Sequence, residues 1–127
     1  MTQEECLSEL ERWAELPLER LAYLMGYAKA LDPLRRSPEE VWQRVMNEQE
    51  RLNTYFSRGA SDALGQVVFP RMIEAGVDPE QIRQAIKGLK SIDLLIWAHA
   101  QLNPALAHHL PKRMARIAAL LGSRAEA

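Results

Sequence analysis

Apolar residues recur at three- and four-residue steps along most of this 127-residue chain, which is the spacing of one face of an α-helix. Thr2 followed by Glu5 has the spacing of a capping box, and the apolar stripe behind it predicts a first helix ending near Glu15. Pro17 suits the first position of a second helix, whose stripe continues to Asp32-Pro33. Both helices are amphipathic, so each must bury one face against another element.

The strongest local start signal is Ser37-Pro38-Glu39-Glu40, which combines an N-cap serine with proline at the first helical position and an early glutamate. A third helix should begin there. Its apolar stripe comprises Val41, Val45, Leu52, Tyr55 and Phe56. The glycines and the proline that follow predict a break or kink within residues 57–70.

The segment Ala75-Gly76-Val77-Asp78-Pro79 predicts a helix stop, a short turn and a new N-cap followed by proline. The helix that starts there should continue to about Leu102. Two X-Pro steps interrupt the chain at 103–104 and 110–111, and a last helix is expected over residues 112–121. Gly122 should end that helix and leave a frayed tail at about 123–127.

The composition favours helices over strands, because the chain holds 17 Ala and 18 Leu but 13 Val, Ile and Thr together. We therefore predict one all-α domain over residues 1–127, a compact bundle of five to seven antiparallel helices. The chain has no apolar run of the roughly 20 residues that span a bilayer. An acidic N-terminus unlike a signal peptide and a single cysteine, Cys6, favour a cytoplasmic protein with a buried thiol.

The sequence lacks the usual patterns of catalysis. It contains no HExxH pair, no glycine-rich phosphate loop and no serine nucleophile elbow. The adjacent pair His108 and His109 would point about 100° apart on a helix, and His99 fits a hydrogen-bonded residue at the edge of the core better than a proton shuttle. We expect neither an enzyme nor a bound metal or cofactor.

Charge is distributed unevenly along the chain. Residues 1–40 carry nine acids and five bases, residues 41–80 six and four, and residues 81–127 two and seven, so the net charges are −4, −2 and +5. Such an asymmetry points the C-terminal third toward an anionic partner. Six bases fall into two helical clusters with phosphate-contacting potential: Arg83, Lys87, Lys90, Lys112, Arg113 and Arg116.

Each of these features has a plainer alternative. The basic clusters could be an ordinary solvated face, and Trp97, which could stack on an unpaired base, could instead belong to the core. The segment from Phe69 to Lys90 also has the spacing of a helix-turn-helix, with Arg83 among the would-be base-reading residues of a phage or plasmid regulator. A protein-interaction or dimerisation module would use three apolar anchors: Trp13, Trp42 and Met46.

Four short motifs carry a family resemblance, in the order Leu21-Ala22-Tyr23-Leu24-Met25-Gly26, Tyr55-Phe56-Ser57, Ala60-Ser61 and Val68-Phe69-Pro70-Arg71-Met72. Together they resemble the C-terminal helical region of the large subunit of type I CRISPR Cascade complexes, which some systems also make separately as the small subunit. The resemblance covers roughly residues 20–75. It implies a noncatalytic all-helical protein of bacterial antiviral defence, often present in several copies.

The same resemblance implies contacts with nucleic-acid backbone, including a displaced DNA strand. The leading hypothesis is therefore a helical subunit of a nucleoprotein complex that contacts single-stranded DNA or guide RNA through the six bases named above. Its other partners would be further subunits of the complex or copies of itself. If this is right, binding should depend steeply on salt concentration.

Overall fold

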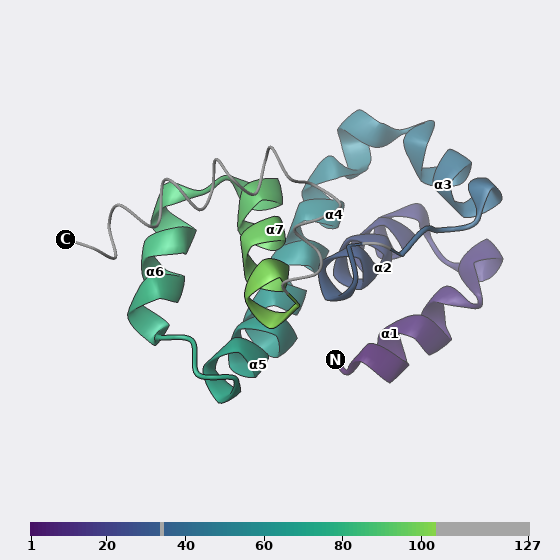
Figure 1. The fold of residues 1–127 in the computed structure, drawn as a ribbon. Helices are drawn as coiled ribbons and strands as arrows, with labels where there is room; N and C mark the ends of the chain where they lie inside the picture. Colours follow the sequence, from purple (N-terminus) through teal and green to yellow (C-terminus); the bar gives the residue numbers. More distant parts are fainter. Residues whose placement is uncertain (34, 104–127) are drawn as a thin grey trace. The chain divides into compact units, whose positions relative to one another are not determined.

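The computed structural model describes residues 1–33 and 35–103 (Figure 1). In these residues the chain forms helices and no strands, which confirms the predicted all-α fold. The chain divides into two compact units, Met1–Val68 and Phe69–Ala127, each of which is described by itself. The organisation as one domain stays a prediction.

The elements follow one another with short connections. Unit 1 contains α1 (Gln3–Leu10), the 3₁₀-helix η1 (Trp13–Glu15), α2 (Leu18–Leu31), α3 (Glu39–Met46), α4 (Gln49–Ala63) and the π-helix η2 (Leu64–Val68). Unit 2 contains α5 (Phe69–Glu74), α6 (Pro79–Gly88) and α7 (Ser91–Leu102) in its described part. Figure 1 shows these helices coloured along the sequence.

The first helix begins as predicted, because the Thr2 hydroxyl accepts a hydrogen bond from the Glu5 amide at 3.1 Å. Its predicted end near Glu15 is wrong. The α-helix stops at Leu10 and the chain tightens into η1. The Arg44 guanidinium donates to the carbonyl oxygens of Trp13 and Leu16 and so stabilises the chain at the end of η1.

The predicted continuous helix from Ser37 through Phe56 is also wrong. It is broken at Asn47 and Glu48, where the Glu48 backbone (φ −130°, ψ 36°) leaves helical geometry. Asn is a weak helix former, and the break lets α3 and α4 pack against α2 as separate helices. At their starts, Pro17 and Pro38 occupy the N-cap, one residue before the predicted boundary.

The core of unit 1 is an apolar cluster shared by α2, α3 and α4. Its buried members are Leu21, Ala22, Met25, Val41, Val45 and Leu52. Partly buried side chains surround it, namely Leu10, Trp13, Leu16, Leu18, Met46 and Phe56. The apolar stripes predicted from the sequence are therefore the faces that meet, except that Tyr55, predicted on the core stripe, is 39% exposed. Adjacent residues on a helix point about 100° apart, and here Phe56 packs against the cluster while Tyr55 is exposed.

Two glycines set the distance between α2 and α4. A Cβ built on Gly26 would overlap the carbonyl group of Phe56, and one built on Gly59 would overlap that of Tyr23. The clashes are with backbone atoms on the facing helix, which cannot turn away as a side chain can. Glycine is thus required on both helices for this close approach.

Hydrogen bonds from two tyrosines then join α2 to α4, to η2 and to the N-terminal residue. The Tyr23 hydroxyl donates to Asp62 Oδ2 at 2.6 Å, and the Tyr27 hydroxyl lies 2.7 Å from the Met1 carbonyl oxygen and 2.9 Å from Gln66 Oε1. Burial and, to a smaller extent, the hydrogen bond to Asp62 together raise the pKa of Tyr23 to about 12. Both phenols are therefore held in the protonated form that can donate.

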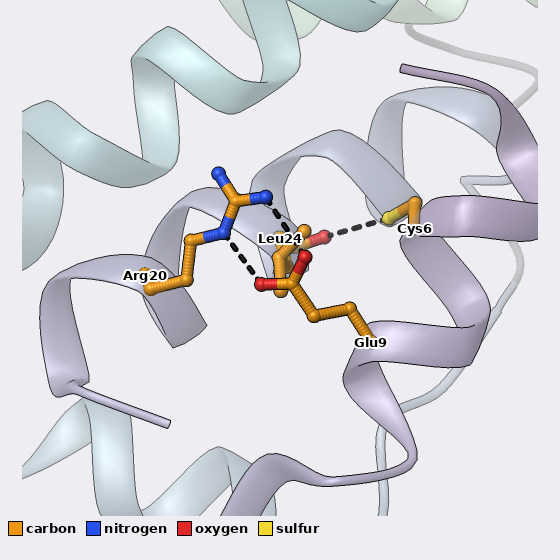
Figure 2. A network of polar contacts seen from close by, with 4 residues as sticks. All are labelled: Cys6, Glu9, Arg20 and Leu24. Carbon is orange, nitrogen blue, oxygen red and sulfur yellow. Dashed lines mark hydrogen bonds and ion pairs between the residues drawn. The ribbon is translucent and has the colours of Figure 1, made fainter. Parts of the chain in front are cut away.

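Helix α1 is attached to α2 by a bidentate ion pair (Figure 2). Arg20 donates from Nε to Glu9 Oε2 at 2.6 Å and from a terminal nitrogen to Oε1 at 2.9 Å, which lowers the pKa of the Glu9 carboxyl. Beside it, Cys6 Sγ lies 3.5 Å from the Leu24 carbonyl oxygen. Cys6 is fully buried and burial raises the pKa of its thiol, so the predicted buried thiol is confirmed.

The break predicted within residues 57–70 is confirmed as the π-helix η2. Gly59 does not interrupt α4, because its role is packing. The irregularity follows Ala63 and comes just before Pro70, which has no amide hydrogen and cannot continue the regular pattern of helix hydrogen bonds.

The glycine contact predicts that a Gly→Ala substitution destabilises the protein at two positions and not at a third. Gly26→Ala and Gly59→Ala should each lower the free energy of unfolding by about 3 kcal/mol, because the new methyl group forces the helices apart. Gly65→Ala, whose Cβ meets nothing within 4 Å, should be neutral or slightly stabilising. Urea denaturation of the three variants measures this, and equal effects at all three positions would contradict the packing role.

The raised pKa of Tyr23 predicts a loss of stability at alkaline pH. Below pH 10 both the folded and the unfolded chain carry the phenol proton, so its stabilising effect is fully present. As the pH rises from 10 to about 12, the unfolded chain releases this proton and the folded chain keeps it, so stability falls. Urea unfolding across this range should show a shallower decline for Tyr23→Phe; parallel declines would refute the assignment.

Candidate nucleic-acid interface

The turn before α6 has the geometry that the sequence predicts. Gly76 has a positive φ of 99°, and its amide donates to the Ile73 carbonyl at 3.0 Å while the Val77 amide donates to the Met72 carbonyl at 2.9 Å. This pair of hydrogen bonds is a Schellman motif. Asp78 then accepts from the Glu80 amide at 2.9 Å, as the predicted N-cap. Both ends of the turn are therefore fixed by local bonds.

Helix α6 has a buried and an exposed side. Ile82 and Ala85 are buried, whereas Arg83 and Lys87, four residues apart, are exposed. The sequence pattern places Ile86 on the buried side, but its side chain is 49% exposed. Its direction around the helix lies between the buried and the basic positions. The predicted basic face is thus present for two of its three residues.

Arg83 differs from Lys87 in its surroundings. Its guanidinium pairs with Glu80 at 2.9 Å, and both side chains are more than half exposed. A pair this exposed contributes little to stability and is screened by salt. An incoming phosphate can therefore compete for Arg83, but it must displace the carboxylate first. Lys87 has no ion pair among the described residues and carries its charge in the last turn of α6.

The predicted single helix from 79 to 102 is wrong. Helix α6 ends at Gly88, a poor helix former, and Leu89 and Lys90 have extended backbones before α7 starts at Ser91. Lys90 is the exposed N-cap residue of α7 and does not continue the face of α6. Arg83 and Lys87 therefore lie on α6, and Lys90 lies in the connection between α6 and α7.

Trp97 belongs to the core. It is 5% exposed and lies in α7 among Leu95, Ile96 and Ala98, which are also buried. The hypothesis that its ring stacks on an unpaired base is therefore wrong, because a ring enclosed on both faces has none to offer. His99, one turn from the helix end, is half-buried.

The second predicted basic cluster, Lys112, Arg113 and Arg116, lies outside the described residues, as do His108, His109, the helix expected over 112–121 and the tail at about 123–127.

The three apolar anchors predicted for a protein interface have different positions in unit 1. Trp42 is 43% exposed, whereas Trp13 and Met46 are half-buried against the core cluster. On α3, Arg44 binds the carbonyl of Trp13, and Trp42 lies two residues away, which is about 200° around a helix. Of the three anchors, Trp42 is therefore the one whose side chain is exposed.

The arginines of unit 1 divide into two classes. Arg20, Arg44 and Arg51 are each held by carboxylates or backbone carbonyls, whereas no such partner lies among the described residues for Arg12, Arg35, Arg36 and Arg58. Arg58 lies one turn after the exposed Tyr55. The sequence pattern places Tyr55 on the core stripe, whereas the structure leaves it exposed.

Two searches of the described residues give plain results. Residues 1–33 and 35–103 contain no group of three or more His, Cys, Asp or Glu side chains placed to hold a metal ion. None of the helices described is long and apolar enough to cross a membrane.

Comparison with known proteins gives no match: no family model, no curated protein and no solved structure is similar to this chain.

The turn analysis predicts how α6 responds to loss of its cap. Asp78→Ala should lower stability by about 1 kcal/mol, because the Glu80 amide loses its acceptor. Asp78→Asn keeps a side-chain oxygen at the same place and should restore most of this loss. Thermal unfolding followed by circular dichroism compares the two; an Asn variant as unstable as the Ala variant would contradict the capping role.

Proposed function

We propose that this chain is a noncatalytic helical subunit of a nucleoprotein complex, and that its second unit contacts nucleic-acid backbone. The observation that carries the proposal is a pair of exposed lysines, Lys87 in the last turn of α6 and Lys90 in the connection that follows. Neither has an ion pair among the described residues. Phosphate recognition needs charge and donors at the surface, and ammonium groups at such positions supply both.

Three acids lie near the two lysines in the sequence. Glu80 pairs with Arg83, Asp78 caps the opposite end of α6, and Asp93 lies in the first turn of α7. A phosphate that approaches the end of α6 would therefore meet Lys87 and Lys90 first and Arg83 after an exchange of partners. Such contacts are independent of base sequence, as expected of a subunit that follows a backbone.

The family resemblance supports the same proposal from another side. Its first two motifs lie on α2 and α4, and Gly26 of the first motif packs against Phe56 of the second. The resembling residues are thus the ones that join these helices. On this basis we infer the bundle of a Cascade-type helical subunit in a bacterial defence complex, working in the cytoplasm with guide RNA or single-stranded DNA.

A second candidate function is a protein-interaction module. The observation that favours it is Trp42, which is 43% exposed on α3 with Met46 one turn further along the same flank. A large exposed ring next to an adaptable thioether is typical of an anchor at a protein interface.

The proposal predicts that reversing the charge at two positions of unit 2 abolishes nucleic-acid binding. The double variant Lys87→Glu/Lys90→Glu should lose most affinity for a labelled single-stranded oligonucleotide at low salt, and the salt dependence of wild-type binding should be steep. Fluorescence anisotropy across a salt series measures both.

The matched control is Arg35→Glu/Arg36→Glu, which makes the same change of net charge on two exposed residues of unit 1. It should retain most of the affinity. Equal loss in both double variants would mean that net charge alone governs binding, and no binding by the wild type would refute the proposal. Trp42→Ala should leave oligonucleotide binding unchanged and weaken only a protein complex.

A further inference from the structure

Tyr55 stands apart from the other two tyrosines of the chain. The hydroxyls of Tyr23 and Tyr27 are bonded within unit 1, whereas Tyr55 has no hydrogen-bond partner among the described residues. It is 39% exposed and is absent from both the buried cluster and its partly buried surround. The packing of unit 1 therefore gives Tyr55 no clear structural task.

The residue one turn after Tyr55 is Arg58, which is exposed and lacks an ion pair in the described chain. Residues three apart on a helix are neighbours on its surface, so the phenol ring and the guanidinium share one flank of α4. The exposed hydroxyl group of Thr54 lies four residues before Arg58, on the same side of the helix. The flank thus offers an aromatic face, a cation and hydrogen-bond donors.

Unit 1 is acidic overall, but the carboxylates near this flank are already engaged. Arg51, one turn before Tyr55, pairs with Glu19 of α2 and with Glu48 at 3.2 Å. Asp62, one turn after Arg58, accepts the Tyr23 hydroxyl at 2.6 Å. Arg58 is therefore a cation of this flank that is not already bound to a carboxylate of the described chain.

We propose that Tyr55 and Arg58 form a contact for one nucleotide of a single strand, with the base stacked on the Tyr55 ring and the adjacent phosphate held by Arg58. The pairing of an aromatic face with a neighbouring cation is how proteins hold unpaired nucleotides without reading sequence. A base inside a duplex is already stacked on both faces, so the contact selects single strands. The inference rests on the proposed function and adds a binding site on unit 1 to the basic residues of unit 2.

The test compares an oligothymidylate with an abasic strand of the same length, using the full chain. The two strands carry the same phosphates, so their difference in affinity reports base stacking. Tyr55→Ala should weaken binding of the oligothymidylate by roughly 5-fold or more and leave the abasic strand unchanged. Tyr55→Phe keeps the ring and should bind as the wild type does.

Arg58→Gln should act on the phosphate instead. It should weaken both strands alike and reduce the slope of log affinity against log salt by about 0.7. The matched control is Trp42→Ala, which removes the other large exposed aromatic of unit 1 and should change neither affinity. Circular dichroism and thermal unfolding establish that each variant is folded.

The outcomes separate the two proposals. If the wild type binds and Tyr55→Ala binds both strands as well as the wild type, or loses both equally, the stacking contact is refuted while the function proposed for unit 2 stands. If the wild type binds neither strand at low salt, the proposed function fails and the contact fails with it. Loss confined to the strand with bases, restored by Tyr55→Phe, supports the contact.

Discussion

The arrangement of unit 1 depends on the close approach of α2 and α4 at two glycines. Gly26 and Gly59 each face a backbone carbonyl of the other helix, so neither helix can carry a side chain at the crossing. This contact determines which longer interactions are within reach. Only because the helix backbones are so near can the Tyr23 hydroxyl meet Asp62 and the Arg51 guanidinium meet Glu19 across the same pair of helices.

The remaining elements of unit 1 are attached to this pair by side chains that bind charged groups or free backbone oxygens. Arg20 fixes α1 through Glu9, and Arg44 of α3 fixes the η1 turn through two carbonyl oxygens. Among the described residues, no buried side-chain nitrogen or oxygen is left without a partner. These bonds add direction to an apolar core that would by itself allow several ways of packing.

Local signals predicted the parts of this structure that local forces determine. The Thr2 and Asp78 caps and the Gly76 turn each form between residues that are close in the sequence. The local sequence is therefore sufficient to predict them. The sequence does not predict the helix breaks after Met46 and Gly88, because Asn47 and Gly88 weaken a helix without by themselves ending it. Gly59 shows the converse error: a glycine inside a helical stretch predicted a break, yet it serves the contact with α2.

The difference between local and tertiary interactions also explains why the number of charges in a segment predicts only part of the candidate site. The sequence shows how many bases a segment holds, but not which of them already have partners. Arg44 donates hydrogen bonds to backbone carbonyls, and Arg83 pairs with Glu80. Lys87 and Arg58 are exposed and have no ion pair among the described residues. An ion that approaches the protein meets the unengaged cations first, since binding the others requires breaking an existing pair. The proposed contacts therefore use particular unpaired cations, Arg58 in an acidic part of the sequence and Lys87 in a basic part, and do not follow the net charge of either part.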